Sequence, residues 1–147
     1  MTNITMEWPS QTRSEAPVSP RPTLLVVEDD PQLMGMLQIV LEGAGFGVVM
    51  AGDGRQALDT LVRAQDEHIS VDLVMMDLNM PVMDGRECLL HLDSMEKQVP
   101  VLLISGDPWE DLGQEVRQRV AGMVQKPVGL RTLLAQVRRI LARQGQA

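Results

Sequence analysis

The chain has 147 residues, of which 44% are hydrophobic and 22% charged, and its formal net charge is −7. These values are typical of one soluble globular domain and exclude a disordered or fibrous chain. The negative charge argues against non-specific binding of nucleic acid, which requires a positive surface. No apolar run approaches the roughly 18 residues of a membrane span, and the N-terminus lacks a signal-peptide core, so we expect a cytoplasmic protein.

The first 22 residues differ in composition from the rest of the chain. Residues 1–22 contain four prolines among Ser, Thr, Gln and Glu, without hydrophobic periodicity, which predicts a flexible leader. We expect the folded domain to span residues 23–143 and a short tail to span 144–147. Residues 116–147 contain seven basic and no acidic residues. This basic end indicates either a solvated helix face or a surface for an acidic partner.

Five short apolar runs follow, at residues 24–27, 46–51, 73–76, 101–104 and 123–124. Each run precedes a stretch with apolar residues at helical spacing. The helical stripes contain Leu33, Leu37, Val40, Leu41 and Ala44; Ala57, Leu58, Leu61 and Val62; Leu89 and Leu92; and Leu130, Leu133, Leu134, Val137, Ile140 and Leu141. The fourth stretch, residues 109–118, is the weakest helix prediction because its apolar residues are sparse.

This alternation predicts a (βα)₅ chain with an α/β architecture. Runs that are apolar throughout favour parallel strands buried on both faces. Right-handed crossovers then give a doubly wound parallel sheet of five strands with the order 2-1-3-4-5. The run 46–51, which contains Gly47, is expected at an edge of the sheet. No pattern indicates a 3₁₀ helix or a hairpin.

Polar residues follow four of the five runs directly. The sequence continues after these runs with Glu28, Asp29 and Asp30; with Asp77; with Ser105; and with Gln125 and Lys126. Because the carboxyl ends of parallel strands meet at one edge of the sheet, we expect these side chains to converge there. The charge of Asp30 is also expected to serve as a helix N-terminal charge before Pro31.

The chemistry of this group favours phosphoryl transfer. Clustered carboxylates stay ionised together only when a cation lies between them, and a donor set of oxygen alone favours Mg²⁺. Lys126 supplies a compact positive charge and Ser105 a hydroxyl for phosphoryl oxygens. Asp77 is the best candidate nucleophile, which would form an aspartyl phosphate. Lys126 is one of two lysines beside 11 arginines, which suggests that an ammonium is required at this position.

Four motifs, LLVVEDD at 24–30, VMMDLNMP at 74–81 with Asp84-Gly85 after it, LISG at 103–106 and QKP at 125–127, resemble the response-regulator receiver domain of two-component signalling. The resemblance covers about residues 22–143 and implies a CheY-like fold. It implies that Asp77 accepts a phosphoryl group from a sensor histidine kinase or a phosphotransfer protein. Asp29, Asp77 and the backbone carbonyl of Asn79 would ligate Mg²⁺, with Glu28 acting mainly through water. Lys126 and Ser105 would hold the phosphoryl oxygens.

Two features of the sequence concern how the domain would pass on a signal. Met123 stands three residues before Lys126, where the family usually has an aromatic ring that moves with the hydroxyl residue. The chain also ends soon after the fifth predicted helix, so we expect signalling through the domain's own surface. Met36 and Ile39 are expected to form an apolar docking patch for the kinase. A cis bond is expected before Pro127.

A downstream protein target or a homodimer is expected to contact the face made by the fourth and fifth predicted helices and the last strand. This face is predicted to combine acidic and basic side chains, namely Glu110, Asp111 and Glu115 with Arg138 and Arg139. Asp107 is predicted to position a water that hydrolyses the phosphate. We expect no direct contact with nucleic acid or membrane.

The sequence therefore predicts a single-domain response regulator, a phosphorylation switch that catalyses its own phosphorylation and dephosphorylation and turns over no separate substrate. The main alternative is an interaction module with the same fold that works without phosphorylation. A flavodoxin-like cofactor protein is disfavoured because three carboxylates follow the first run. An aspartate-based phosphatase is disfavoured because Asn79 stands where a second aspartate is needed.

Overall fold

A computed structural model describes residues 21–80, 82–83, 85–95 and 97–144. The predicted leader at 1–22 and the predicted tail at 144–147 lie almost entirely outside the described residues, so these boundaries remain predictions. Asp84, which belongs to one of the four motifs quoted above, also lies outside them. No helix among the described residues is both long enough and apolar enough to span a bilayer.

The centre of the domain is a parallel sheet with the order β2-β1-β3-β4-β5, which confirms the predicted fold class. The strands are β1 (Thr23–Val27), β2 (Gly47–Ala51), β3 (Leu73–Asp77), β4 (Val101–Ser105) and β5 (Gly122–Gln125). β1, β3 and β4 are buried along their whole length, as expected for strands covered on both faces. β2 lies at an edge of the sheet, as predicted.

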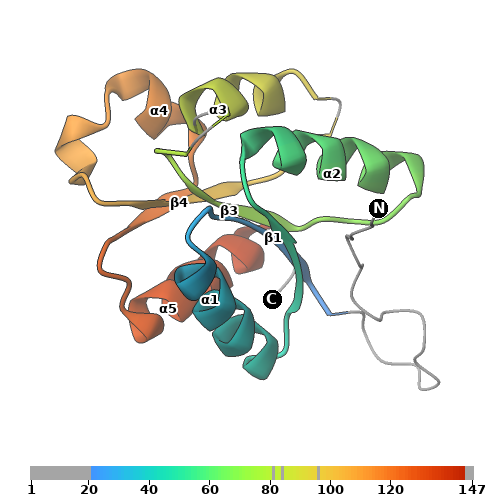
Figure 1. The fold of residues 1–147 in the computed structure, drawn as a ribbon, viewed down its shortest axis with the longest axis horizontal. Helices are drawn as coiled ribbons and strands as arrows, with labels where there is room; N and C mark the ends of the chain where they lie inside the picture. Colours follow the sequence, from blue (N-terminus) through green and yellow to red (C-terminus); the bar gives the residue numbers. More distant parts are fainter. Residues whose placement is uncertain (1–20, 81, 84, 96, 145–147) are drawn as a thin grey trace.

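Helices cover both faces of this sheet. The helices are α1 (Pro31–Gly43), α2 (Gly54–Asp66), α3 (Gly85–Asp93), α4 (Gln114–Arg119) and α5 (Leu130–Arg143). Figure 1 shows α1 and α5 on one face, and α2, α3 and α4 on the other. This arrangement is the doubly wound one that the alternating pattern predicts.

The segment between β4 and β5 differs from the prediction. A 3₁₀ turn, η1 (Trp109–Asp111), precedes α4, although no sequence pattern indicated a 3₁₀ helix. Gly113 between them has φ of +85°, a left-handed conformation that interrupts a continuous helix. Only Leu112 and Val116 of this segment are fully buried. The predicted helix at 109–118 is therefore one short turn followed by a six-residue helix.

Side chains of the connecting loops define where two helices begin. Asp30 is the N-cap of α1, and its carboxylate accepts a hydrogen bond from the Gln32 amide at 3.0 Å. Asp53 caps α2 in the same way through the Gln56 amide at 2.9 Å. The predicted role of Asp30 as a helix N-terminal charge is confirmed, because its carboxylate satisfies an amide that the helix leaves unpaired.

Three apolar residues differ in solvent exposure from the prediction. Val62 and Leu130 are 52% and 41% exposed, because each lies at the margin of its helix's buried face. Met36, expected on the surface with Ile39, packs partly buried against the core beneath α1 and α5. Only Ile39, which is 74% exposed, remains as the apolar surface residue of that patch.

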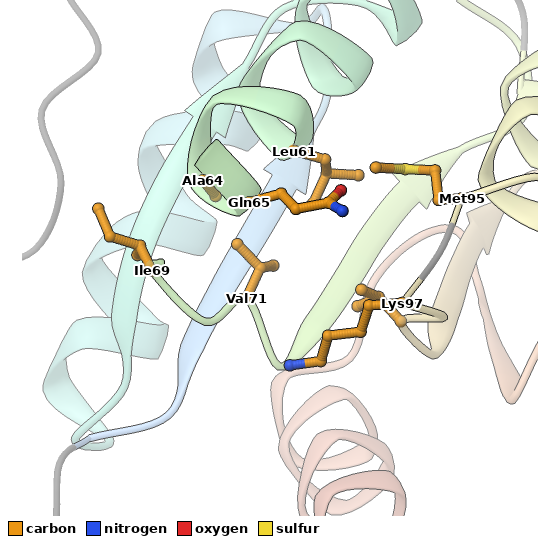
Figure 2. A pocket seen from close by; sticks show the side chains of 8 residues that line it. Leu61, Ala64, Gln65, Ile69, Val71, Met95 and Lys97 are labelled. Carbon is orange, nitrogen blue, oxygen red and sulfur yellow. The ribbon is translucent and has the colours of Figure 1, made fainter. Parts of the chain in front are cut away.

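The amino ends of the strands carry a small apolar pocket of about 50 Å³. Figure 2 shows it between Leu61 and Gln65 of α2, Val71 before β3, and Met95 and Lys97 after α3. It lies at the opposite end of the strands from the carboxylates described next, since Val71 precedes β3 whereas Asp77 ends it. The pocket is a packing gap beneath α2 and is distinct from the candidate site.

Candidate functional site

The candidate site lies at the carboxyl edge of the sheet. Glu28 and Asp29 directly follow β1, Asp77 and Ser105 end β3 and β4, and Lys126 directly follows β5. Asp77 and Ser105 are aligned by the sheet itself, because Asp77 pairs in register with Ile104 of β4. Four strands thus bring together side chains that are up to 98 positions apart in the sequence.

Three carboxylates form an acidic cluster at this edge. Glu28, Asp29 and Asp77 each offer a carboxylate oxygen, and the three oxygens lie within 4.8 Å of one another. Glu28 is 1% exposed and Asp77 5% exposed, whereas Asp29 is open to solvent. Buried carboxylates at this separation repel each other strongly unless positive charge lies nearby.

Lys126 supplies positive charge from the protein itself. Its Nζ lies 2.7 Å from Asp77 Oδ2 and 3.9 Å from Glu28 Oε1. Burial alone would lower the pKa of Lys126, but the hydrogen bond to Asp77 and the charges of Asp77, Glu28 and Asp29 outweigh it and raise that pKa. The ammonium therefore stays protonated and neutralises part of the carboxylate charge.

Glu28 retains an unsatisfied oxygen. Its Oε2 accepts a hydrogen bond from the Asp30 amide at 3.1 Å, whereas its buried Oε1 has no hydrogen-bond partner among the described residues. Burial raises the pKa of Glu28, and the amide of Asp30 and the charge of Lys126 only partly oppose this. A divalent cation is a natural partner for such an oxygen, and a cluster of oxygen ligands alone fits a hard ion such as Mg²⁺.

Both oxygens of Asp77 are engaged. Oδ1 accepts a hydrogen bond from the Asn79 amide at 3.0 Å, and Oδ2 accepts one from Lys126. The connection to α3 also packs closely on this strand end. A Cβ atom on Gly85 would lie 2.6 Å from Leu78 Cα and 2.9 Å from the Asp77 carbonyl oxygen. Gly85 therefore permits this close approach, a supporting role that the sequence analysis did not predict.

Ser105 is fully buried at the end of β4. Its Oγ accepts a hydrogen bond from the Asp107 amide at 3.0 Å, and its carbonyl accepts one from the Lys126 amide at 2.8 Å. The side chain of Gln125 also donates to the Gly106 carbonyl at 3.4 Å. The loops after β4 and β5 are thus tied together, and the Lys126–Pro127 bond is cis, as expected.

Met123 stands at the position where the family usually has an aromatic ring. Met123 is partly buried and packs against the apolar core beneath α2, α3 and α4. The acidic side chains of Glu110, Asp111 and Glu115 make no ion pair among the residues that the structure describes. The predicted acidic side chains of this face therefore form no ion pair with its arginines in the described part of the chain.

Comparison with known proteins assigns the family. Residues 24–138 match the response regulator receiver domain. The chain belongs to this family. It is 34% identical over 131 residues to the transcriptional regulatory protein PrrA of Mycobacterium tuberculosis, covering 84% of this chain and 52% of PrrA. It is 36% identical over 127 residues to the transcriptional regulatory protein CpxR of Escherichia coli K12, covering 82% of this chain and 49% of CpxR.

Solved structures agree with this assignment of the receiver domain. The chemotaxis protein CheY4 of Vibrio cholerae matches with a TM-score of 0.66 and 30% identity, covering 82% of this chain and 99% of that chain. The receiver domain of Francisella response regulator 1452 matches with a TM-score of 0.74 at 24% identity, which supports the fold alone. The chain spans about half the length of the curated relatives that it matches. The comparisons therefore identify a receiver domain of two-component response regulators.

Proposed function

We propose that this receiver domain accepts a phosphoryl group on Asp77 in a magnesium-dependent reaction and thereby switches its protein contacts. The observation that supports this most directly is the position of the Asp77 carboxylate. It lies 2.7 Å from the Lys126 ammonium and within the acidic cluster that contains the unsatisfied Glu28 oxygen. A nucleophile placed between an ammonium and a cation-binding cluster is suited to stabilise the charge of phosphoryl transfer.

The proposed reaction forms a bond between an Asp77 carboxylate oxygen and phosphorus, while the bond from phosphorus to the donor's imidazole nitrogen breaks. Lys126 moves its hydrogen bond from the carboxylate to a phosphoryl oxygen, and the hydroxyl of Ser105 donates to another. Glu28, Asp29 and Asp77, with the Asn79 carbonyl, would hold Mg²⁺, which supplies positive charge to the phosphoryl oxygens. The Asn79 amide fixes the orientation of Asp77.

The proposed donor is a sensor histidine kinase or a phosphotransfer protein. The proposed recipients of the signal are a protein target or a second copy of this chain, through the α4, β5 and α5 face. The acidic side chains of η1 and α4, which form no ion pair with any described residue, and the exposed Arg138 of α5 support such a contact, because opposite charges on this face are available to a partner. Curated relatives are named as transcriptional regulators, and contact with nucleic acid is outside this proposal.

A phosphorylation assay tests the central step. The protein is incubated with acetyl phosphate and Mg²⁺, and intact mass is measured for one added phosphoryl group. We expect Asp77→Asn to remain unlabelled, whereas Asp59→Asn, at an exposed position of α2, labels like the wild type. Chelation of Mg²⁺ should prevent labelling, and Glu28→Gln should weaken Mg²⁺ binding at least tenfold. Equal labelling of the wild type and Asp77→Asn would reject Asp77 as the acceptor.

The alternative is a receiver-fold interaction module that binds its partner without phosphorylation. The observation that favours it is Met123, because a thioether packed in the core lacks the ring that couples phosphorylation to the surface elsewhere in the family. Partner binding distinguishes the two functions. A switch binds its partner with different affinity before and after phosphorylation, whereas the module binds equally in both states and equally as Asp77→Asn.

A further inference from the structure

Two arginines of α4 hold the segment that follows Ser105. The guanidinium of Arg117 donates hydrogen bonds to the backbone carbonyls of Trp109 at 3.4 Å and Glu110 at 3.3 Å. Arg119 forms an ion pair with Asp93, the last residue of α3, and donates to the Glu115 carbonyl at 3.1 Å. One arginine therefore joins α4 to η1, and the other joins α4 to α3.

The contacts of Arg117 make η1 and α4 one unit. Without them the two pieces would be linked mainly through Leu112 and Gly113, and the left-handed backbone of Gly113 breaks the helical path between them. Within the part of the chain described by the structure, Arg119–Asp93 is the one ion pair that connects this unit to another element. It lies at the C-terminal end of α4.

Open space separates most of α4 from α3. A surface hollow of about 740 Å³ lies between Arg86 of α3 and the α4 residues from Gln114 to Gln118, although Leu112 and Val116 are buried in the core. Solvent therefore lies between the exposed sides of α3 and α4, and the Arg119–Asp93 ion pair bridges the two helices at the C-terminal end of α4. A displacement of the unit must lengthen the Arg119–Asp93 ion pair or rotate the unit about it.

Ser105 is connected directly to this unit. Its hydroxyl is held by the Asp107 amide, and Asp107 is followed by Pro108, the N-cap of η1. A shift of the Ser105 hydroxyl toward a phosphoryl group on Asp77 would therefore carry the loop at 106–108 with it or break this hydrogen bond. The position of η1 and α4 is therefore linked to the position of the Ser105 hydroxyl.

We propose that Arg117 and Arg119 are positioning residues for Ser105. Arg117 makes η1 and α4 move together, and the Arg119–Asp93 ion pair favours the arrangement in which Asp107 holds the Ser105 hydroxyl. Breaking this ion pair then favours engagement of the phosphoryl group. The mechanism rests on the proposed function and provides a route from the site to α4 that needs no aromatic ring at Met123.

The test measures binding of beryllofluoride, a phosphoryl mimic, to the full chain in the presence of Mg²⁺ by calorimetry. We expect Arg119→Gln to bind it about two- to fivefold more tightly than the wild type, the range that loss of one exposed ion pair allows. Arg119→Lys retains the charge and should restore wild-type affinity. Arg63→Gln is the control, because it breaks another surface ion pair, between Arg63 of α2 and Glu67 at the end of that helix.

Double variants separate coupling from simple loosening of the structure. Asp93→Asn should reproduce the effect of Arg119→Gln, and the double variant should show no larger effect. In an Arg117→Gln background, Arg119→Gln should no longer change the affinity, because η1 and α4 are then uncoupled. A general loss of stability would not produce this pattern.

Two results would overturn the inference in distinguishable ways. If the wild type binds beryllofluoride but Arg119→Gln behaves like Arg63→Gln, the positioning role is wrong and the proposed function stands. If neither the wild type nor Arg119→Gln binds beryllofluoride in a manner that depends on Asp77, the proposed function fails and the positioning role fails with it.

Discussion

Helices α1 and α5, with 13 and 14 residues, cover one face of the sheet, whereas the other face carries α2 and the shorter α3 and α4, with nine and six residues. The cores beneath them also differ. The first core is built from Leu, Val, Ile and Phe with one buried methionine from the sheet, whereas the second contains several buried methionines and a cysteine. Methionine adapts its shape more readily than branched side chains do.

The site residues divide between these faces in an informative way. Glu28 and Lys126 precede α1 and α5, the long helices of the first face, whereas Asp77 and Ser105 precede α3 and η1 on the second. Glu28 and Lys126, which gain no covalent group in the proposed reaction, therefore connect to the two long helices of the first face. The proposed acceptor and the hydroxyl are attached to the face with short helices and an open hollow, which is the one better suited to change shape.

The largest expected difference between the faces is in the cost of removing a buried side chain. Leu133→Ala in α5 should lower the free energy of unfolding by about 3 kcal/mol, because Leu133 is 0% exposed in the first core. Val116→Ala in α4 should cost about 1 kcal/mol and mainly speed hydrogen exchange within α4. Urea unfolding and hydrogen exchange measure both, and equal global losses would contradict the comparison.

Two glycines provide a second contrast. Gly85→Ala should destabilise the domain by about 2 kcal/mol, because its Cβ would lie 2.6 Å from Leu78 Cα. Gly35→Ala in α1 meets no atom within 4 Å and should stabilise the domain by about 0.5–1 kcal/mol through helix propensity. Thermal unfolding gives both values. A neutral Gly85→Ala would show that the start of α3 adjusts easily.

Cys88 of α3 reports opening of the second face. Burial, with the charge of Glu87, raises the pKa of its thiol to about 11, from 9.0. At pH 8 the folded protein should therefore react with a thiol reagent at least ~100-fold more slowly than the unfolded chain. The unfolded thiol loses its proton first, so stability should fall by about 1 kcal/mol as the pH rises from 8 to 10. Rapid native labelling would indicate that α3 opens frequently.

The last contrast concerns the loop after β3. Val82 is 79% exposed and has φ of +68°, a left-handed conformation that is unfavourable for a β-branched residue. Val82→Asn should stabilise the domain by about 1 kcal/mol, because asparagine adopts this conformation more readily. Val62→Asn, at an exposed helical position of α2, should leave the stability almost unchanged, because valine and asparagine have similar helix propensities. The denaturation midpoint should therefore rise for Val82→Asn and stay close to the wild-type value for Val62→Asn.

The sequence predicts the fold and the location of the candidate site well because both depend on simple periodicities. Wholly apolar runs indicate buried parallel strands, and the residue after each run falls at one edge of the sheet. Margins of helix faces were less predictable, so Val62 and Leu130 were placed inside although they are exposed. The single turn at η1 was missed because the left-handed conformation of Gly113 is a property of the folded chain.

Long side chains were the hardest to place from sequence. Arg117 and Arg119 read as part of a basic surface, yet they contact η1 and α3. An arginine can reach partners on several neighbouring elements, so its contacts depend on how the helices pack. The close approach of Gly85 to β3 was hidden for the same reason, since it requires the distance between two backbones that the sequence does not encode locally.

The distribution of the candidate site over β1, β3, β4 and β5 has a consequence for the newly synthesised chain. Asp77 and Lys126 are separated by 49 positions, and Glu28 lies a further 49 positions before Asp77. No contiguous fragment shorter than most of the domain contains all three, and a misassembled sheet would scatter them. Chemistry that needs all three groups is therefore available only to molecules that have completed folding. A signal produced at this site thus comes from correctly folded protein.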